Sequence, residues 1–173
     1  YRPADALEAA ECWELAVRRK NGPSILALTR QNVPAVRDDA TKNMCERGGY
    51  VLKPGKGKDD IVLIASGSEV HLAVEAHEEL EKQGISARVV SMPCLDVFEE
   101  QEDSYFRSVL GNDLPKIVIE AGIRQGWDAL IGRDGGFIGM DSFGASAPGA
   151  ELFPHFGITT EAIVKMALEK VKG

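Results

Sequence analysis

The chain has 173 residues, of which 44% are hydrophobic, and it carries a formal net charge of -7 at pH 7. This length suits one domain, or one domain with a piece of another, and the apolar content is sufficient for a packed core. The negative charge argues against nucleic acids and anionic membranes as partners, because both are bound by basic surfaces. We therefore expect a cytoplasmic protein without such partners.

The cysteines and the first residue give further information about the class of protein. Cys12, Cys45 and Cys94 are odd in number and widely spaced, so they indicate neither a zinc site nor a disulfide framework. Free thiols suit a reducing compartment. No apolar run approaches the length of a membrane span. The first residue is Tyr1 rather than Met, and we expect the chain to be a piece of a longer protein.

The first 46 residues predict a helix, a strand and a linker. Asp5 is a suitable N-cap for a helix over 6–20. The apolar run Ser24–Thr29 is typical of a buried strand, and Pro34 forbids its regular continuation. Residues 37–47 are charged and lack apolar periodicity, so we interpret them as a surface linker. A strand edge left without neighbours here would tend to pair with another chain.

Strands alternate with helices over the remaining residues. Expected strands are Tyr50–Leu52, Ile61–Ala65, Ala87–Val90, Lys116–Ile119 and Phe137–Met140; expected helices are Glu69–Lys82, a stretch through Phe98 and Phe106, and one from Thr159 or Thr160 to about Lys172. Such alternation predicts a three-layer αβα doubly wound fold. Its mostly parallel sheet has about five strands, and Tyr50–Leu52 is expected as an antiparallel edge strand.

Arg30 is the residue whose position most suggests binding. It stands at the end of the expected strand Ser24–Thr29, beside Gln31 and Asn32. A guanidinium with neighbouring amides suits bidentate binding of a phosphate or a carboxylate. A surface salt bridge explains the same position equally well, and the spacing alone leaves both interpretations open.

Two further segments follow expected strands, at the edge where open α/β sheets bind ligands. The backbone of Ser66–Glu69 could bind an anion at the start of a helix, although the segment lacks both GxGxxG spacing and a Walker lysine. We favour a tight turn with an N-cap there. Glu120 is suited to act as an acid, as a base or as a structural hydrogen-bond acceptor, and the sequence does not decide between these roles.

The histidines and one small-residue loop complete the candidates. His71, His77 and His155 have no metal-ligand spacing, so we expect no metal site. His77 is expected at the core boundary and His155 in a loop before the last helix. The loop Gly144–Pro148 has the small residues that close packing against another chain or domain requires.

Several segments together resemble the C-terminal part of transketolases. They are RPAD at Arg2–Asp5, TRQN at Thr29–Asn32, RGGYVL at Arg47–Leu52, GSEV at Gly67–Val70, VVSMP at Val89–Pro93, Asp96, Phe98, Gln101, VIEAG at Val118–Gly122, FGASAP at Phe143–Pro148 and FGIT at Phe156–Thr159. Each segment alone is weakly specific. In this order, over almost the whole chain, they are highly specific.

The resemblance implies a function for the complete enzyme. Transketolases transfer a two-carbon ketol unit from a ketose phosphate to an aldose phosphate in the pentose phosphate pathway. They use thiamine diphosphate with Mg²⁺ or Ca²⁺, and they are homodimers of three-domain subunits. On this template, residues 1–46 are the tail of the thiamine pyrimidine-binding domain plus a linker, and residues 47–173 are the C-terminal domain.

The resemblance also implies which functional residues this chain holds. Arg30 matches the arginine that binds the substrate phosphate. The thiamine-activating glutamate, the metal ligands and the catalytic histidines would all belong to preceding parts of the polypeptide. We therefore expect no catalytic, cofactor-binding or metal-binding residue here, and no activity or bound cofactor for the chain alone.

Related functions stay open at this point. Dihydroxyacetone synthase is hard to distinguish, because its specificity is set largely upstream. TRQN at Thr29–Asn32 and SMP at Ser91–Pro93 argue against 1-deoxyxylulose-5-phosphate synthase and 2-oxo acid dehydrogenase β subunits. A stand-alone α/β module that binds an anion or a partner protein is the non-enzymatic alternative.

Overall fold

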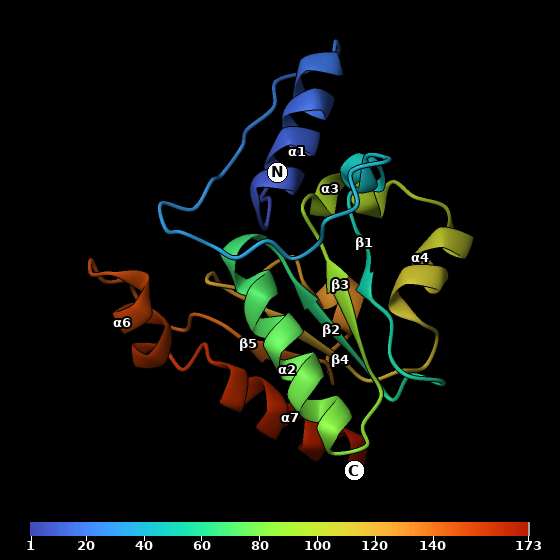
Figure 1. Ribbon diagram of the computed structural model, residues 1–173, viewed down its shortest axis with the longest axis vertical. Helices are drawn as coiled ribbons and strands as arrows, with labels where there is room; N and C mark the ends of the chain where they lie inside the picture. The colour runs from blue at the N-terminus through green and yellow to red at the C-terminus, as the bar shows by residue number, and fades with distance from the viewer. Residues whose placement is uncertain (173) are drawn as a thin grey trace.

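The computed structural model describes residues 1–172, and it has an open α/β fold in three layers (Figure 1). Its α-helices are α1 (Ala6–Arg18), α2 (Val70–Lys82), α3 (Leu95–Glu99), α4 (Asp103–Leu110), α5 (Asp128–Ile131), α6 (Gly149–His155) and α7 (Thr160–Lys172). Its strands are β1 (Tyr50–Lys53), β2 (Ile61–Ala65), β3 (Ala87–Ser91), β4 (Lys116–Ile119) and β5 (Gly136–Ile138), and its 3₁₀ turns are η1 (Met44–Arg47) and η2 (Gly67–Glu69).

The five strands form one sheet in the order β1-β3-β2-β4-β5. All neighbouring pairs are parallel except β1 and β3, which are antiparallel. The chain leaves β2 for one neighbour, β3, and later returns to the other, β4. The expected doubly wound sheet with an antiparallel edge strand is therefore confirmed.

Alternate residues of the central strand contribute to different layers. Ile61, Leu63 and Ala65 of β2 belong to the core formed with α2 and α7. Val62 and Ile64 belong to the opposite core, formed with α3, α4 and α5. All five side chains are fully buried, because helices cover both faces of the sheet. No helix described here has the length and apolar character that crossing a membrane requires.

The N-terminal helix forms as predicted, but the strand after it does not. The Asp5 carboxylate accepts a hydrogen bond from the Glu8 N–H at 2.8 Å and thereby caps α1. Residues 24–29 are extended but are not a strand, which corrects the prediction. Within the described residues, their ladder-like backbone contacts are with Tyr1 alone, whose terminal N–H donates to the Ile25 carbonyl and whose carbonyl accepts from the Ala27 N–H. A strand needs partners that this short segment lacks within residues 1–172.

The structure makes smaller corrections nearer the C-terminus. The expected helical stretch through Phe98 and Phe106 is two helices, α3 and α4. Two short helices, α5 and α6, were not predicted, and His155 is the last residue of α6 rather than a loop residue. Thr159 rather than Thr160 caps α7, because its hydroxyl accepts from the Ala162 N–H at 3.2 Å. The other expected strands and helices form within two residues of their predicted bounds.

The linker enters the sheet through a fixed corner at Gly48. Its φ of +80° lies in the left-handed region. A Cβ at this position would lie 2.3 Å from the Phe98 N and 2.4 Å from the Cys94 carbonyl oxygen, and both atoms belong to the backbone around α3. Only glycine allows the linker to pass this close to α3.

We predict that Phe98→Ala lowers the free energy of unfolding by about 3–5 kcal/mol, because it leaves a cavity in a close-packed core. Phe98 is fully buried and lies against the rings of Tyr105 and Phe106. Phe143→Ala is the matched control, because the Phe143 side chain is 99% exposed, and it should change stability by less than about 0.5 kcal/mol. Urea denaturation of both variants checks this, and equal losses would contradict the assigned core.

Candidate functional site

A cluster of charged side chains lies where β2 and β4 end. Its members are Arg2, Ser66, Glu69 and Glu120, and we call it the Arg2 cluster. Ser66 follows β2 and Glu120 follows β4, so the parallel pairing of these strands brings the two side chains to the same edge of the sheet. A cavity of about 300 Å³ opens beside Arg2, Ser66 and Glu120. Open α/β sheets usually bind ligands at this edge.

Within the Arg2 cluster, one guanidinium is bound by two carboxylates. Arg2 Nη2 lies 2.9 Å from Glu69 Oε2, and Arg2 Nη1 pairs with Glu120 Oε1. Arg2 Nη1 also donates to Ser66 Oγ at 3.0 Å, and that hydroxyl donates to Glu120 Oε2 at 2.6 Å. Both oxygens of Glu120 are thus engaged within the protein. Glu120 is a structural acceptor here, and it is not free to act as an acid or a base.

The backbone of the Gly67 turn is engaged by the same arginine. The Gly67 N–H donates to the Arg2 carbonyl at 2.9 Å, and the Arg2 N–H donates to the Pro93 carbonyl at 2.7 Å. The Gly67 N–H is therefore not available to a free anion, which argues against the alternative that this turn binds one. The favoured alternative, a tight turn before a helix, is confirmed as η2, although the Ser66 side chain makes no capping hydrogen bond.

Arg30 lies on the extended segment 24–32, which we call the Arg30 segment. Arg30 is exposed, and its guanidinium makes no hydrogen bond or ion pair with any of residues 1–172. The side chain of the next residue, Gln31, lies close to the C-terminal part of the chain: a Cβ on Gly149, at the start of α6, would lie 1.9 Å from Gln31 Nε2. The salt-bridge alternative for Arg30 therefore finds no support, and the guanidinium is open to solvent.

A second group of buried carboxylates joins α1 to the sheet. Glu8 is fully buried and accepts hydrogen bonds from the Ala4 N–H at 2.7 Å, the Tyr50 hydroxyl at 2.7 Å and the Ser91 hydroxyl at 2.6 Å. Burial raises the pKa of the Glu8 carboxyl above its ordinary value, although these hydrogen bonds oppose the shift. Asp5, besides capping α1, accepts from the Val36 N–H at 2.9 Å.

Glu11 joins the linker to the same helix. Its Oε2 pairs with Arg37 and accepts from the Met44 N–H at 3.1 Å. The buried Cys45 thiol lies beside Cys12, and a hydrogen bond to Cys12 together with burial raises the pKa of Cys45. The thiol therefore stays protonated, as expected of a structural rather than a reactive cysteine.

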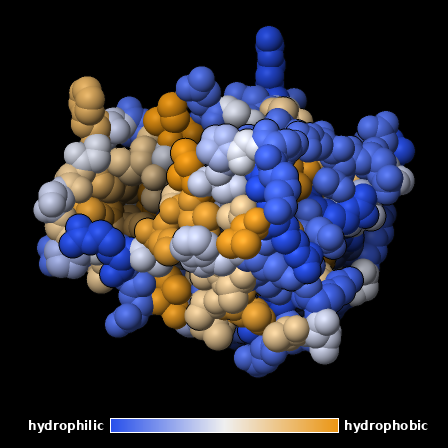
Figure 2. Space-filling model, turned by 90° about the horizontal axis from the view of Figure 1, so that it is seen from above, coloured by the Kyte–Doolittle hydropathy of each residue, from blue (hydrophilic) through white to orange (hydrophobic). Residues whose placement is uncertain are grey.

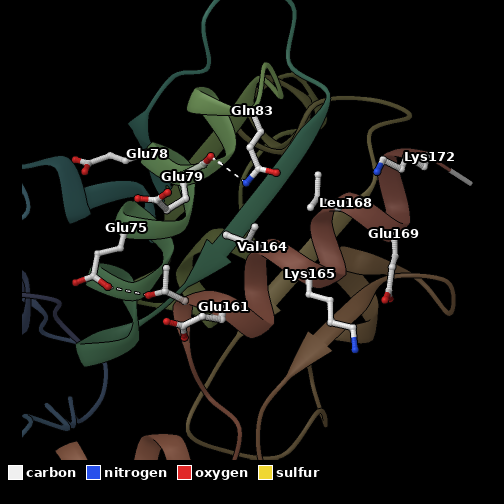
Figure 3. Close-up of a pocket in the computed structure, with 11 residues that line it drawn as sticks. Glu75, Glu78, Glu79, Gln83, Glu161, Val164, Lys165, Leu168, Glu169 and Lys172 are labelled. Carbon is white, nitrogen blue, oxygen red and sulfur yellow. Dashed lines mark hydrogen bonds between the residues drawn. The ribbon is translucent and has the colours of Figure 1, made fainter.

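Neither a metal-binding group around the histidines nor an anion site in the groove between α2 and α7 is found within residues 1–172. His77 is half-buried at the core boundary, as predicted, with Nδ1 2.6 Å from the Ala87 carbonyl oxygen. Within residues 1–172, no three His, Cys, Asp or Glu side chains are placed to hold a metal ion. The groove between α2 and α7 has a volume of about 810 Å³, and Figure 3 shows carboxylates around it, including Glu75, Glu161 and Glu169. Like charge opposes phosphate binding there.

An apolar surface lies on the outer side of α1 and the Arg30 segment. Trp13, Val17, Ile25 and Leu28 are each more than half exposed. Side chains of α1 and of the Arg30 segment line a groove of about 380 Å³ between them. Figure 2, which views the molecule from the end where α1 lies, shows hydrophobic residues gathered beside a hydrophilic area. Exposed apolar grooves of this kind mark surfaces that pack against other protein.

The fold and the Arg2 cluster define a doubly wound α/β domain that is bound through buried ion pairs to a preceding segment. The sequence profile of the transketolase-like TK C-terminal domain matches residues 48–159. The chain belongs to this family, and the resemblance drawn from its motifs is confirmed.

Whole transketolases align with nearly the entire chain. The transketolase of Sinorhizobium medicae is 51% identical over 174 residues, which cover 99% of this chain and 25% of that protein. The solved transketolase of Leishmania mexicana is 36% identical with a TM-score of 0.89, covering 99% of this chain and 25% of its own. A Pichia stipitis transketolase in complex with xylulose 5-phosphate is 37% identical with a TM-score of 0.89, at the same coverages. The chain thus spans about a quarter of the length of these relatives.

We predict that Glu8→Gln changes how stability depends on pH. A carboxyl whose pKa is raised by folding stabilises the folded state fully below its unfolded pKa of about 4.5, and this contribution is lost as the pH rises through the folded pKa. Glutamine does not titrate, so the stability of Glu8→Gln relative to the wild type should improve from about pH 4.5 upward. Denaturation from pH 4 to 8 measures this. A constant difference between the two proteins would contradict the raised pKa.

Proposed function

We propose that this chain is the C-terminal region of a transketolase, in which Arg30 binds the phosphate of the sugar substrate. The alignment with whole transketolases over 99% of the chain is the observation that carries this proposal. The guanidinium of Arg30, which is exposed and has no partner among residues 1–172, agrees with it. A sugar phosphate bound by a relative, xylulose 5-phosphate, is the substrate class we assign.

We further propose that residues 1–46 complete the thiamine pyrimidine-binding domain and that residues 47–173 form the C-terminal domain. The apolar groove along α1 and the Arg30 segment supports this division, because it offers an extended segment and exposed apolar side chains to the rest of such a domain. Homodimers, as in the family, would form around the complete subunit.

The residues of this chain do not by themselves fit thiamine diphosphate or its metal ion. No acidic, histidine or cysteine group of three is arranged for a cation within residues 1–172, and the acid beside the sheet edge, Glu120, is engaged by Arg2 and Ser66. We therefore assign the cofactor and the ketol-transfer chemistry to the preceding three quarters of the polypeptide. This chain contributes substrate binding through Arg30.

Arg30 acts by charge and by geometry. A planar guanidinium presents a fixed pair of N–H donors that match two oxygens of a phosphate. The Arg30 side chain has no competing carboxylate partner among residues 1–172, so no internal ion pair has to break when the phosphate binds. Its contribution should be to substrate affinity rather than to bond cleavage, because the phosphate is remote from the carbonyl that reacts.

We predict that Arg30→Gln in the full-length protein raises the KM for xylulose 5-phosphate by about 10- to 100-fold, the cost of losing charge-assisted hydrogen bonds. The KM for xylulose, which lacks the phosphate, should not change. Arg133→Gln is the matched control, because Arg133 is an exposed arginine on the loop between α5 and β5. Steady-state kinetics with both ketoses measures the effect, and an unchanged preference for the phosphorylated ketose in Arg30→Gln would refute the role.

We also predict that the 173-residue chain alone transfers no ketol group when supplied with thiamine diphosphate and Mg²⁺. The side chains of residues 1–172 provide no group of three that could hold the metal ion of the cofactor. A coupled assay with xylulose 5-phosphate and ribose 5-phosphate, with the full-length protein as the positive control, measures this. Turnover by the isolated chain would contradict the assignment of the cofactor and the ketol-transfer chemistry to the rest of the polypeptide.

A further inference from the structure

Glu69 and Glu120 have no role in the substrate chemistry proposed above. Burying their carboxylates nevertheless costs free energy. The side chains of Glu69 and Glu120 are 1% and 9% exposed, and a single guanidinium, itself one-third exposed, faces them both. Buried ion pairs contribute little net stability, because desolvation offsets most of their attraction. Their best-attested use is to fix how one element lies against another.

The element that these carboxylates fix is the start of the chain. The Arg2 side chain is bound by Ser66, Glu69 and Glu120, and its backbone is bound on both sides, by Pro93 and by Gly67. Five different residues of the C-terminal domain therefore determine where Arg2 lies. Rotation of Arg2 about either backbone bond would break at least one of these contacts.

Tyr1, the neighbour of Arg2, passes this restraint to the Arg30 segment. Its N–H donates to the Ile25 carbonyl at 2.7 Å, and its carbonyl accepts from the Ala27 N–H at 2.8 Å. These two bonds, on either side of Leu26, have the pattern of a parallel strand pair. Arg30 follows Ala27 by only three residues, which span at most about 11 Å even when fully extended.

The other side of Arg30 is also held by the C-terminal domain. The exposed Gln31 side chain contacts Gly149, and this flexible end does not by itself fix the backbone. Further along, Val36 is buried in the core between the sheet and α2, and its N–H binds Asp5. The exposed arginine thus lies on an irregular segment that is anchored on both sides. An irregular segment held in this way can keep a binding side chain in place before the ligand arrives.

We propose that Ser66, Glu69 and Glu120 are positioning residues: by binding Arg2 they hold the Arg30 segment in the conformation that receives the phosphate. This inference rests on the proposed function of Arg30 and gives the C-terminal domain a specific part in substrate recognition. The three residues do not touch the substrate. They act through Arg2 and Tyr1.

The test compares Glu120→Gln with Arg30→Gln in the full-length protein. Glu120→Gln keeps the size of the side chain but removes its charge, so the hold on Arg2 weakens. The KM for xylulose 5-phosphate should rise by about three- to tenfold, the range expected for one lost hydrogen bond, with kcat unchanged. The KM for xylulose should stay constant. The double variant should be no worse than Arg30→Gln alone, because both substitutions remove the same interaction.

Controls separate this inference from the proposed function and from general damage. Glu102→Gln removes an exposed carboxylate that pairs with Arg47 and should leave every parameter unchanged. If Arg30→Gln raises the KM for the phosphorylated ketose but Glu120→Gln does not, the positioning role is wrong and the function of Arg30 stands. If Arg30→Gln has no effect, the proposed function itself fails. Equal increases for both ketoses in Glu120→Gln would also overturn the positioning role.

A second pair of measurements guards against a variant that does not fold. Ser66→Ala removes the hydroxyl that accepts from Arg2 and donates to Glu120, but it leaves the ion pairs of Arg2 with Glu69 and Glu120 in place, so it should give a smaller KM increase of the same kind. Amide hydrogen exchange on the 173-residue chain reports the mechanism directly. Exchange at Ala27 should accelerate in Glu120→Gln while exchange at Val118, inside β4, stays slow. Unchanged exchange at Ala27 would contradict the link from Glu120 through Arg2 to the Arg30 segment.

Discussion

The position of Arg2 between Glu69 and Glu120 is the contact on which the relation of the two parts of the chain depends. Two carboxylates face one guanidinium at the edge of the sheet, with Ser66 completing the set. If the guanidinium is removed, both buried carboxylates lose their cation and keep only the hydrogen bonds from Ser66 and Ser68. Removing one partner of a buried ion pair typically costs about 3–5 kcal/mol. The contact can therefore be lost only together with the arrangement of the elements around it.

The junction between α1 and the sheet also contains buried polar contacts, beside the apolar contacts of Ala4 and Val36. Glu8 accepts from two hydroxyls and a backbone N–H, and Glu11 binds the backbone of the linker. Such contacts are directional, whereas apolar packing tolerates sliding. The apolar side chains of α1, including Trp13 and Val17, instead point away from the sheet. One side of this helix is thus attached in a fixed orientation, and the other side remains available for packing.

The sequence predicts the sheet better than it predicts the site, because the sheet is encoded locally. Ile61–Ala65 is apolar at every position, and only a strand covered on both faces needs that pattern. Ser24–Thr29 has a similar composition but no neighbouring strands within residues 1–172, and composition does not reveal missing partners. The short helices α5 and α6 span too few residues for an apolar period to be recognised.

The Arg2 cluster shows why the candidate site could not be predicted in full from the sequence. Arg2 was visible as part of the RPAD motif, and Glu120 was singled out by its place after a strand, but they are separated by more than a hundred positions. No spacing rule connects residues at that distance. Arg30 was found through the amides beside it and through the family motif. The burial of Val36, which holds the chain after Arg30, could be seen only in three dimensions.

Gly48 limits movement between residues 37–47 and the sheet. A glycine between a linker and a strand is commonly taken for a hinge, because it permits many backbone conformations. Here the backbone of α3 lies against its Cα, and the Gly48 N–H and carbonyl are bound by Cys45 and Cys94. The same residue that offers rotational freedom in an open chain is locked in this one. We therefore do not expect Gly48 to act as a hinge between residues 37–47 and the sheet.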